Sequence, residues 1–79
     1  MDIRSELRKF ISSEILGARG GSSLSDSENL LESGLDSLGI LRLTVFIEDK
    51  FSVSVPDESV TPENIRSVDA LVQLVESLR

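Results

Sequence analysis

Apolar residues recur at helical spacing in three long stretches of this chain. In residues 2–16 they occupy one face of a helix, and they are Ile3, Leu7, Phe10, Ile11 and Ile15. Asp2 is placed to cap the start of this segment, and Gly17 is placed to end it in a left-handed conformation. We therefore predict an amphipathic helix over residues 2–16.

The other two stretches cover residues 37–51 and 67–79. The first has a wide apolar arc, formed by Leu38, Ile40, Leu41, Leu43, Val45, Phe46 and Ile47. A wide arc indicates a helix packed on more than one side, with Asp36 or Ser37 as its N-cap. In residues 67–79 the apolar positions again repeat at helical spacing, and they are Val68, Leu71, Val72, Val75 and Leu78.

The connections between these stretches are irregular. Residues 17–34 are rich in Gly and Ser and exceed the usual loop length, although Leu24, Leu30 and Leu31 could reach the core and one helical turn is possible near residues 26–31. Residues 51–55 alternate apolar and polar like a strand. With no second strand to pair with, we interpret them as an extended connector whose apolar side chains point inward. Thr61 and Pro62 are typical of the start of a short helix.

The predicted fold is all-α: a small bundle of three main helices plus one short helix, with a long loop between the first two. We expect the 79 residues to form one domain, 1–79. The composition, with 39% hydrophobic and 28% charged residues, is typical of a globular protein. No apolar run approaches the roughly 20 residues that span a bilayer, and no signal-peptide pattern opens the chain. We expect a cytoplasmic monomer without membrane insertion.

The composition narrows the chemistry that the chain can perform. It contains no Cys, hence no thiol of its own, and no His, which excludes a Ser-His-Asp hydrolase. The net charge of −6 disfavours binding to nucleic acid and favours partners with basic patches.

One serine stands out. In the run Gly34-Leu35-Asp36-Ser37-Leu38 it lies where the Ser- and Gly-rich loop gives way to the helix of residues 37–51. At that position its hydroxyl faces outward beside free backbone N–H groups, and the positive end of the helix favours a phosphate ester. The alternative is that Ser37 is a helix cap and nothing more.

The chain resembles an acyl carrier protein over nearly its full length. Residues 30–38, Leu-Leu-Glu-Ser-Gly-Leu-Asp-Ser-Leu, match the signature that opens the second helix of that family. The layout also agrees: an amphipathic helix, a long loop, the serine, a helix ending at residues 48–51, the connector Val55-Pro56-Asp57 and a last helix.

The resemblance implies that a phosphopantetheinyl transferase esterifies Ser37 with 4′-phosphopantetheine from coenzyme A. Acyl or aminoacyl groups are then carried on this arm as thioesters, and ligase, synthase or transferase enzymes load them. The resemblance thus implies a carrier that has no catalytic or metal-binding residue of its own. Asp36 would help to position the metal ion and coenzyme A on the docked transferase. Leu38 would contact the transferase or pack beneath the site.

In this family the second helix is the main docking surface for partner enzymes. We expect docking contacts from Leu38, Arg42, Glu48 and Asp49. Fatty acid synthesis carriers usually have acidic residues where this chain has Gly39 and Arg42. A reversed charge on a recognition face changes which partners are tolerated. We therefore expect a specialised carrier of a lipid, polyketide or nonribosomal peptide pathway.

Two other classes of function stay open at this point. A helical interaction domain could have kept the fold and the serine without carrying anything. A metal-dependent hydrolase would need clustered carboxylates, and no Asp or Glu group has that spacing. Phe10, Phe46 and Phe51 are expected in the core, where they could also line a cavity for a bound acyl chain.

Overall fold

The computed structural model describes residues 2–15 and 25–79 and is all-helical there, without a strand. The predicted fold class is thus confirmed for the described part of the chain. The elements are α1 (Ile3–Phe10), a π-helical turn (Ile11–Ile15), α2 (Leu30–Ser33), α3 (Ser37–Phe51), a 3₁₀ turn (Asp57–Ser59), α4 (Pro62–Ile65) and α5 (Val68–Leu78). The predicted helix end at Gly17 and the inward-facing Leu24 lie outside the described residues.

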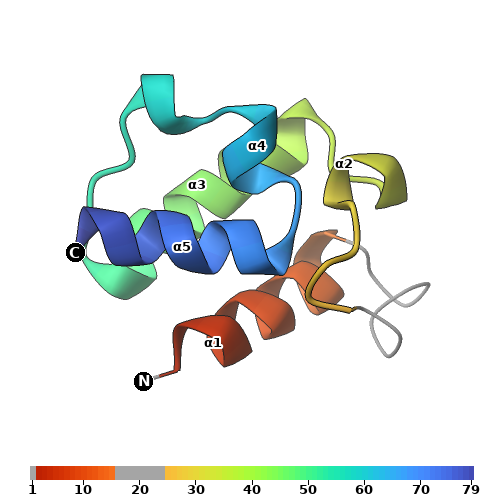
Figure 1. The fold of residues 1–79 in the computed structure, drawn as a ribbon, viewed down its shortest axis with the longest axis horizontal. Coiled ribbons are helices and arrows are strands. Elements are labelled where there is room, and N and C mark those ends of the chain that lie inside the picture. Colours follow the sequence, from red (N-terminus) through yellow and green to blue (C-terminus); the bar gives the residue numbers. More distant parts are fainter. Residues whose placement is uncertain (1, 16–24) are drawn as a thin grey trace.

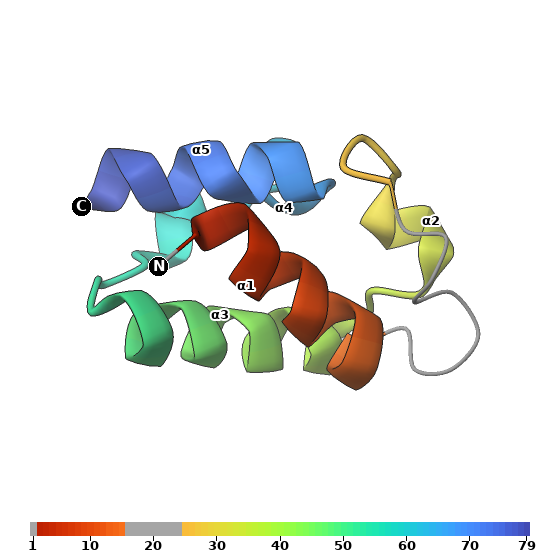
Figure 2. The same cartoon turned by 90° about the horizontal axis from the view of Figure 1, so that it is seen from below.

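The three long helices form the body of the molecule. Helices α3 and α5 run in the same direction, and α1, which packs on α5, runs in the opposite direction (Figures 1 and 2). Helix α4 packs on α5, and α2 packs on α4 at the end of the molecule where α3 begins (Figure 1). The buried apolar core draws on every helix, and its members are Ile3, Leu7, Ile11, Leu30, Leu35, Leu43, Ile47, Val55, Ile65, Val68, Leu71, Val72, Leu74 and Val75.

The first helix departs from the predicted regular α-helix. It ends at Phe10 and continues as the π-helical turn Ile11–Ile15, whose wider hydrogen-bonding pattern admits one more residue per turn. Asp2 is at the N-cap position, but its side chain makes no capping hydrogen bond, so the predicted side-chain cap is wrong. The Asp2 backbone carbonyl instead accepts the N–H of Glu6 at 3.1 Å.

The described residues form two short α-helices, α2 and α4, where one was predicted. The helical turn expected at residues 26–31 lies further along, as α2, because Asn29 provides the cap by accepting the N–H groups of Leu31 and Glu32. Helix α4 begins as predicted, with Thr61 as its N-cap and Pro62 as its first residue. Ser67 caps α5, and the extended connector after α3 buries Val55 as expected.

Helix α3 is packed on one side, not on several. Its buried residues, Gly39, Leu43 and Ile47, repeat every four positions and so lie on one side of the helix. On the opposite side Leu38, Leu41 and Val45 are 65%, 60% and 57% exposed. The prediction of a helix covered on more than one side is therefore wrong, and a continuous row of apolar side chains faces solvent.

The aromatic residues lie at the edge of the core. The rings of Phe10 and Phe46 stack with centroids 4.2 Å apart, and Phe51 meets Phe46 edge-on at 6.1 Å. All three are partly buried and packed against the core. This agrees with the predicted core role, although none of the three is fully enclosed.

Candidate functional site

Ser37 is the first residue of α3, and it is exposed. The preceding Asp36 has an extended backbone, and its Oδ1 accepts the N–H of Gly39 at 2.8 Å. Asp36 is therefore the N-cap, and the alternative in which Ser37 merely caps the helix is wrong. The Ser37 hydroxyl forms no hydrogen bond with any other residue that the structure describes.

A tight turn sets the position of this serine. Gly34 follows α2 with φ at 132°, a conformation that side chains other than glycine's rarely adopt. The turn is closed by the Leu35 N–H, which bonds the Leu30 carbonyl at 2.9 Å. Leu35 is buried directly after it, so the chain is anchored in the core two residues before Ser37. The serine thus projects from a fixed turn.

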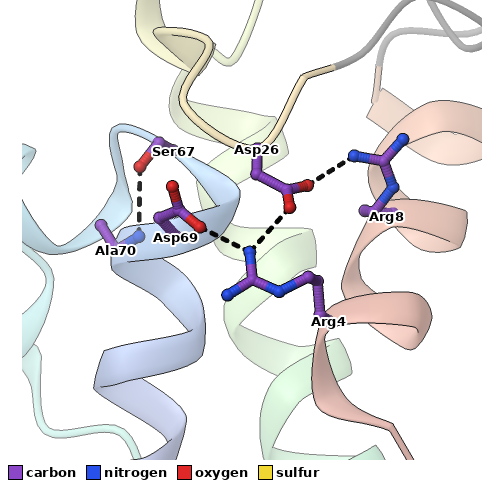
Figure 3. A network of polar contacts seen from close by, with 6 residues as sticks. All are labelled: Arg4, Arg8, Asp26, Ser67, Asp69 and Ala70. Carbon is purple, nitrogen blue, oxygen red and sulfur yellow. Dashed lines mark hydrogen bonds and ion pairs between the residues drawn. The ribbon is translucent and has the colours of Figure 1, made fainter.

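The segment before α2 is held to the rest of the molecule by a cluster of charges. Asp26 accepts hydrogen bonds from Arg4 and Arg8 on α1, and Arg4 also bonds Asp69 on α5 (Figure 3). A backbone hydrogen bond links the same segments, because the Asp69 N–H donates to the Asp26 carbonyl at 3.0 Å. We call Arg4, Arg8, Asp26 and Asp69 the charge clamp. It was not foreseen in the sequence.

The clamp changes the acidity of its central carboxyl group. The hydrogen bond from Arg8 is the largest cause that lowers the pKa of Asp26 below its ordinary value, and the hydrogen bond from Arg4 adds to it. Desolvation opposes this shift and is second in size to the Arg8 bond. In return, Asp69 and Asp26 raise the pKa of Arg4. Asp26 is thus held in its ionised form, which is the form that links the two arginines.

Leu38 points outward beside Ser37. Of the two roles expected for it, contact with a partner and packing beneath the site, its 65% exposure is compatible only with the first. A small hollow of about 170 Å³ lies on the Leu38 side of the site. Its lining comes from α3, from the turn before α3 and from the end of the π-helical turn: Glu14, Ile15, Gly34, Asp36, Leu38, Gly39 and Arg42.

Arg42 connects α3 to the end of the π-helical turn. Its Nη2 lies 2.7 Å from Glu14 Oε1, and its Nη1 donates to the Glu14 carbonyl at 3.3 Å. Glu48 is also engaged, because its Oε2 accepts the N–H of Val55 at 2.8 Å and so fixes the connector after α3. The Asp49 carboxylate makes no hydrogen bond or ion pair with another described residue.

Gly39 is buried rather than available to a partner. A Cβ at this position would lie 3.0 Å from Leu35 Cδ1, 3.3 Å from Asp36 Oδ1 and 3.5 Å from Ile15 Cδ1. The absence of an acidic side chain at residue 39 therefore has a packing reason. This close approach of α3 to the π-helical turn could not be read from the sequence.

An apolar groove opens between α1 and α3. It has a volume of about 420 Å³. Its lining residues, which define the α1–α3 groove below, are Phe10, Leu41, Arg42, Val45, Phe46 and Asp49. The groove begins with Leu41, one helical turn beyond Ser37, and the exposed side chains of Leu41 and Val45 form one of its walls.

Residues 2–15 and 25–79 contain neither a group of metal ligands nor a helix suited to crossing a membrane. No three side chains among His, Cys, Asp and Glu gather there as a group that could hold a metal ion. Within the same ranges, no helix combines the length and the apolar character needed to cross a bilayer.

Comparison with known proteins gives one family match and several relatives. The model of the family described as "Phosphopantetheine attachment site" matches residues 5–75. Aminoacyl carrier protein 1 of Bradyrhizobium diazoefficiens is 26% identical over 74 residues, covering 94% of this chain and 82% of the relative. The acyl carrier protein of Prochlorococcus marinus is 34% identical over 67 residues, covering 85% of this chain and 81% of the relative.

The fold also matches a solved structure. This is the crystal structure of the Bradyrhizobium japonicum glycine:carrier protein ligase complexed with its cognate carrier protein and an analogue of glycyl adenylate. One of its chains superposes with a TM-score of 0.76 and 25% identity, over 96% of this chain and 99% of the matched chain. Because the two chains are nearly equal in length, the matched chain is the carrier protein.

Proposed function

This chain belongs to the phosphopantetheine attachment site family, and we propose that Ser37 is the residue to which its 4′-phosphopantetheine is attached. The relatives are carrier proteins that present their cargo to partner enzymes, and this chain is likewise a carrier and not an enzyme. The observation that supports Ser37 most strongly is its exposed hydroxyl at the start of α3, left free because Asp36 provides the cap.

The surroundings of Ser37 fit a phosphodiester. In the first turn of a helix the N–H groups lack an intrahelical acceptor, and the helix dipole favours an anion at that end. Asp36 occupies one such group, the N–H of Gly39, and leaves those of Ser37 and Leu38 free to face the attached anion. When bound, the group supplies a flexible arm with a terminal thiol for acyl or aminoacyl thioesters.

The neighbours of Ser37 have proposed roles in recognition. The Asp36 carboxylate helps to position the metal ion and coenzyme A when the transferase is docked. Leu38, Arg42, Glu48 and Asp49 contribute to the docking surface along α3. In this surface Arg42 is the sole charged residue among positions 37–47, and it is paired with Glu14, so partners meet a mainly apolar face near Ser37.

We propose an aminoacyl cargo, delivered by a carrier protein ligase in a specialised pathway. An aminoacyl carrier protein is among the relatives, and the matched structure is a carrier bound to a glycine ligase. Arg42 supports a partner set different from that of fatty acid synthesis, since an arginine paired with Glu14 leaves this stretch of α3 without the negative charge that basic patches recognise on an acidic helix.

The attachment is tested by incubating the purified chain with coenzyme A, magnesium and a broad-specificity phosphopantetheinyl transferase. We expect the intact mass to rise by one phosphopantetheine in the wild type and to stay unchanged in Ser37→Ala. Ser54→Ala, at an exposed serine in the connector after α3, is the matched control and should be modified like the wild type. A mass gain that persists in Ser37→Ala, or no gain in the wild type, refutes the proposal; the latter outcome favours a helical interaction domain that carries nothing.

A further inference from the structure

The α1–α3 groove lies on a direct path from the attachment residue. Leu38, Leu41 and Val45 form an exposed apolar row that starts beside Ser37 and leads along α3 into the groove. In the described part of the chain, they are the only large hydrophobic residues that are mostly exposed to solvent. At the far end of the groove, Asp49 presents a carboxylate without an ionic partner among the described residues.

We propose that the carrier's own arm docks in this groove when it is loaded with an aminoacyl group. The apolar part of the arm lies along the exposed row, and the ammonium group of the cargo sits beside Asp49. The inference rests on the proposed function, namely attachment at Ser37 and an aminoacyl cargo. It adds a cargo-binding site on the surface of the molecule, outside the closed core.

The dimensions agree with this arrangement. Asp49 follows Ser37 by twelve positions, which corresponds to about 18 Å along the helix at a rise of 1.5 Å per residue. From Ser37 Oγ to the terminal sulfur, the arm contains about 14 covalent bonds and extends to roughly 16 Å, at about 3.5 Å per three bonds. The three bonds from the sulfur to the amino nitrogen of the cargo add about 3.5 Å. A nearly extended arm therefore brings the ammonium group to Asp49.

The chemistry of the groove matches an aminoacyl end. The stacked rings of Phe10 and Phe46 form a defined apolar surface that can cover the methylene groups of the arm. An aminoacyl thioester keeps a positive ammonium group but no carboxylate, so it is attracted to Asp49. Arg42, the other charged residue that lines the groove, is paired with Glu14. Asp49 is therefore the unpaired charge of the groove lining.

Docking of this kind is reversible. An ion pair exposed to solvent gains little, and the groove is open on one side, so the arm remains free to enter a partner enzyme. A plain acyl group of the same size shares the apolar contacts but lacks the ammonium group. The groove therefore distinguishes aminoacyl from acyl cargo by the interaction with Asp49.

The test compares two stable loaded forms. The transferase is supplied with coenzyme A analogues whose thiol is replaced by an amine, acylated with either glycine or propionate. Propionyl has the same number of non-hydrogen atoms as glycyl but no charge. Mass spectrometry first establishes complete modification, and the backbone amide signals of Leu41, Val45, Phe46 and Asp49 are then followed by NMR.

We expect both forms to shift the signals of Leu41 and Val45, and the glycyl form alone to shift that of Asp49. The extra shift should disappear in Asp49→Asn and persist in Asp57→Asn, a matched exposed aspartate on the 3₁₀ turn. It should also disappear at about 1 M salt, where the screening length falls to about 3 Å.

Equal shifts at Asp49 in the glycyl and propionyl forms overturn the proposal, as do shifts confined to residues 35–39. Groove signals that respond only when a partner enzyme is added also overturn it, because the groove then belongs to the partner. A failure of attachment at Ser37 is seen separately as an unchanged mass, and it removes both proposals.

Discussion

At the scale of single residues, the site depends on two neighbours with different roles. Asp36 and Ser37 are both common helix caps, so the sequence could not decide which of them begins α3. The hydrogen bond from the Gly39 N–H to Asp36 assigns the cap to the aspartate. The serine hydroxyl is thereby left exposed, which is the condition for its proposed modification.

The two proposed roles of Asp36 can be separated by substitution. Asp36→Ala should lower the free energy of unfolding by about 1 kcal/mol, because the cap is lost, whereas Asp36→Asn should keep most of it, because asparagine caps equally well. Urea denaturation measures this difference. Both variants should be modified more slowly by the transferase, since both lack the carboxylate. An Asp36→Asn protein modified at the wild-type rate would contradict the proposed role of the carboxylate.

At the scale of the elements, the important contact is that of α3 with the π-helical turn. Gly39 allows Ile15 and Leu35 to approach the helix closely, and Arg42 pairs with Glu14 nearby. The contact fixes the N-terminal half of α3, which includes the exposed row and Ser37. A residue that looked like a missing docking charge is thus also a packing residue.

Because of this contact, we predict that two substitutions of Gly39 differ in their effect on stability. Gly39→Asp should lower the free energy of unfolding by about 1–3 kcal/mol through overpacking, and its carboxylate is added beside that of Asp36. In Gly39→Ala the small strain against Leu35 is offset by a gain in helix propensity of up to about 1 kcal/mol. Thermal and urea denaturation compare the two variants. Equal stability of the aspartate and alanine variants would show that the space is larger than the structure indicates.

Most of the elements could be predicted, since the three long helices follow from apolar spacing and the start of α4 at Thr61 follows from capping preferences. Spacing does not say which apolar residues become covered. In a chain this small, only one side of α3 is buried, and Leu38, Leu41 and Val45 stay at the surface. The π-helical turn also escaped prediction, because its residues fit an α-helical pattern equally well.

At the scale of the whole molecule, the charge clamp joins segments that are distant in sequence. Asp26 bonds Arg4 and Arg8, and Arg4 bonds Asp69 (Figure 3). With 14 acidic and 8 basic residues, the sequence allows many such pairs and selects none of them. The clamp holds the segment that leads into α2 and, through it, the turn that carries Ser37.

The clamp predicts a defined loss of stability in acid. The folded-state pKa of Asp26 is lowered, so its contribution is complete above the ordinary value of 3.8 and disappears as the pH falls through the lower folded-state value. The advantage of the wild type over Asp26→Asn, measured by urea denaturation, should therefore begin to fall at about pH 4 and be lost once the pH is below the folded-state pKa of Asp26. Asp57→Asn serves as the control and should lack this dependence. A constant difference between wild type and Asp26→Asn across this range would contradict the assignment.

The most direct test of the whole account is the mass of the protein isolated from its own host. Fragmentation of the intact chain would locate any modification and release its cargo for identification. The account predicts a 4′-phosphopantetheine on Ser37 that bears an aminoacyl group. An unmodified chain, or the same group on another residue, would contradict it.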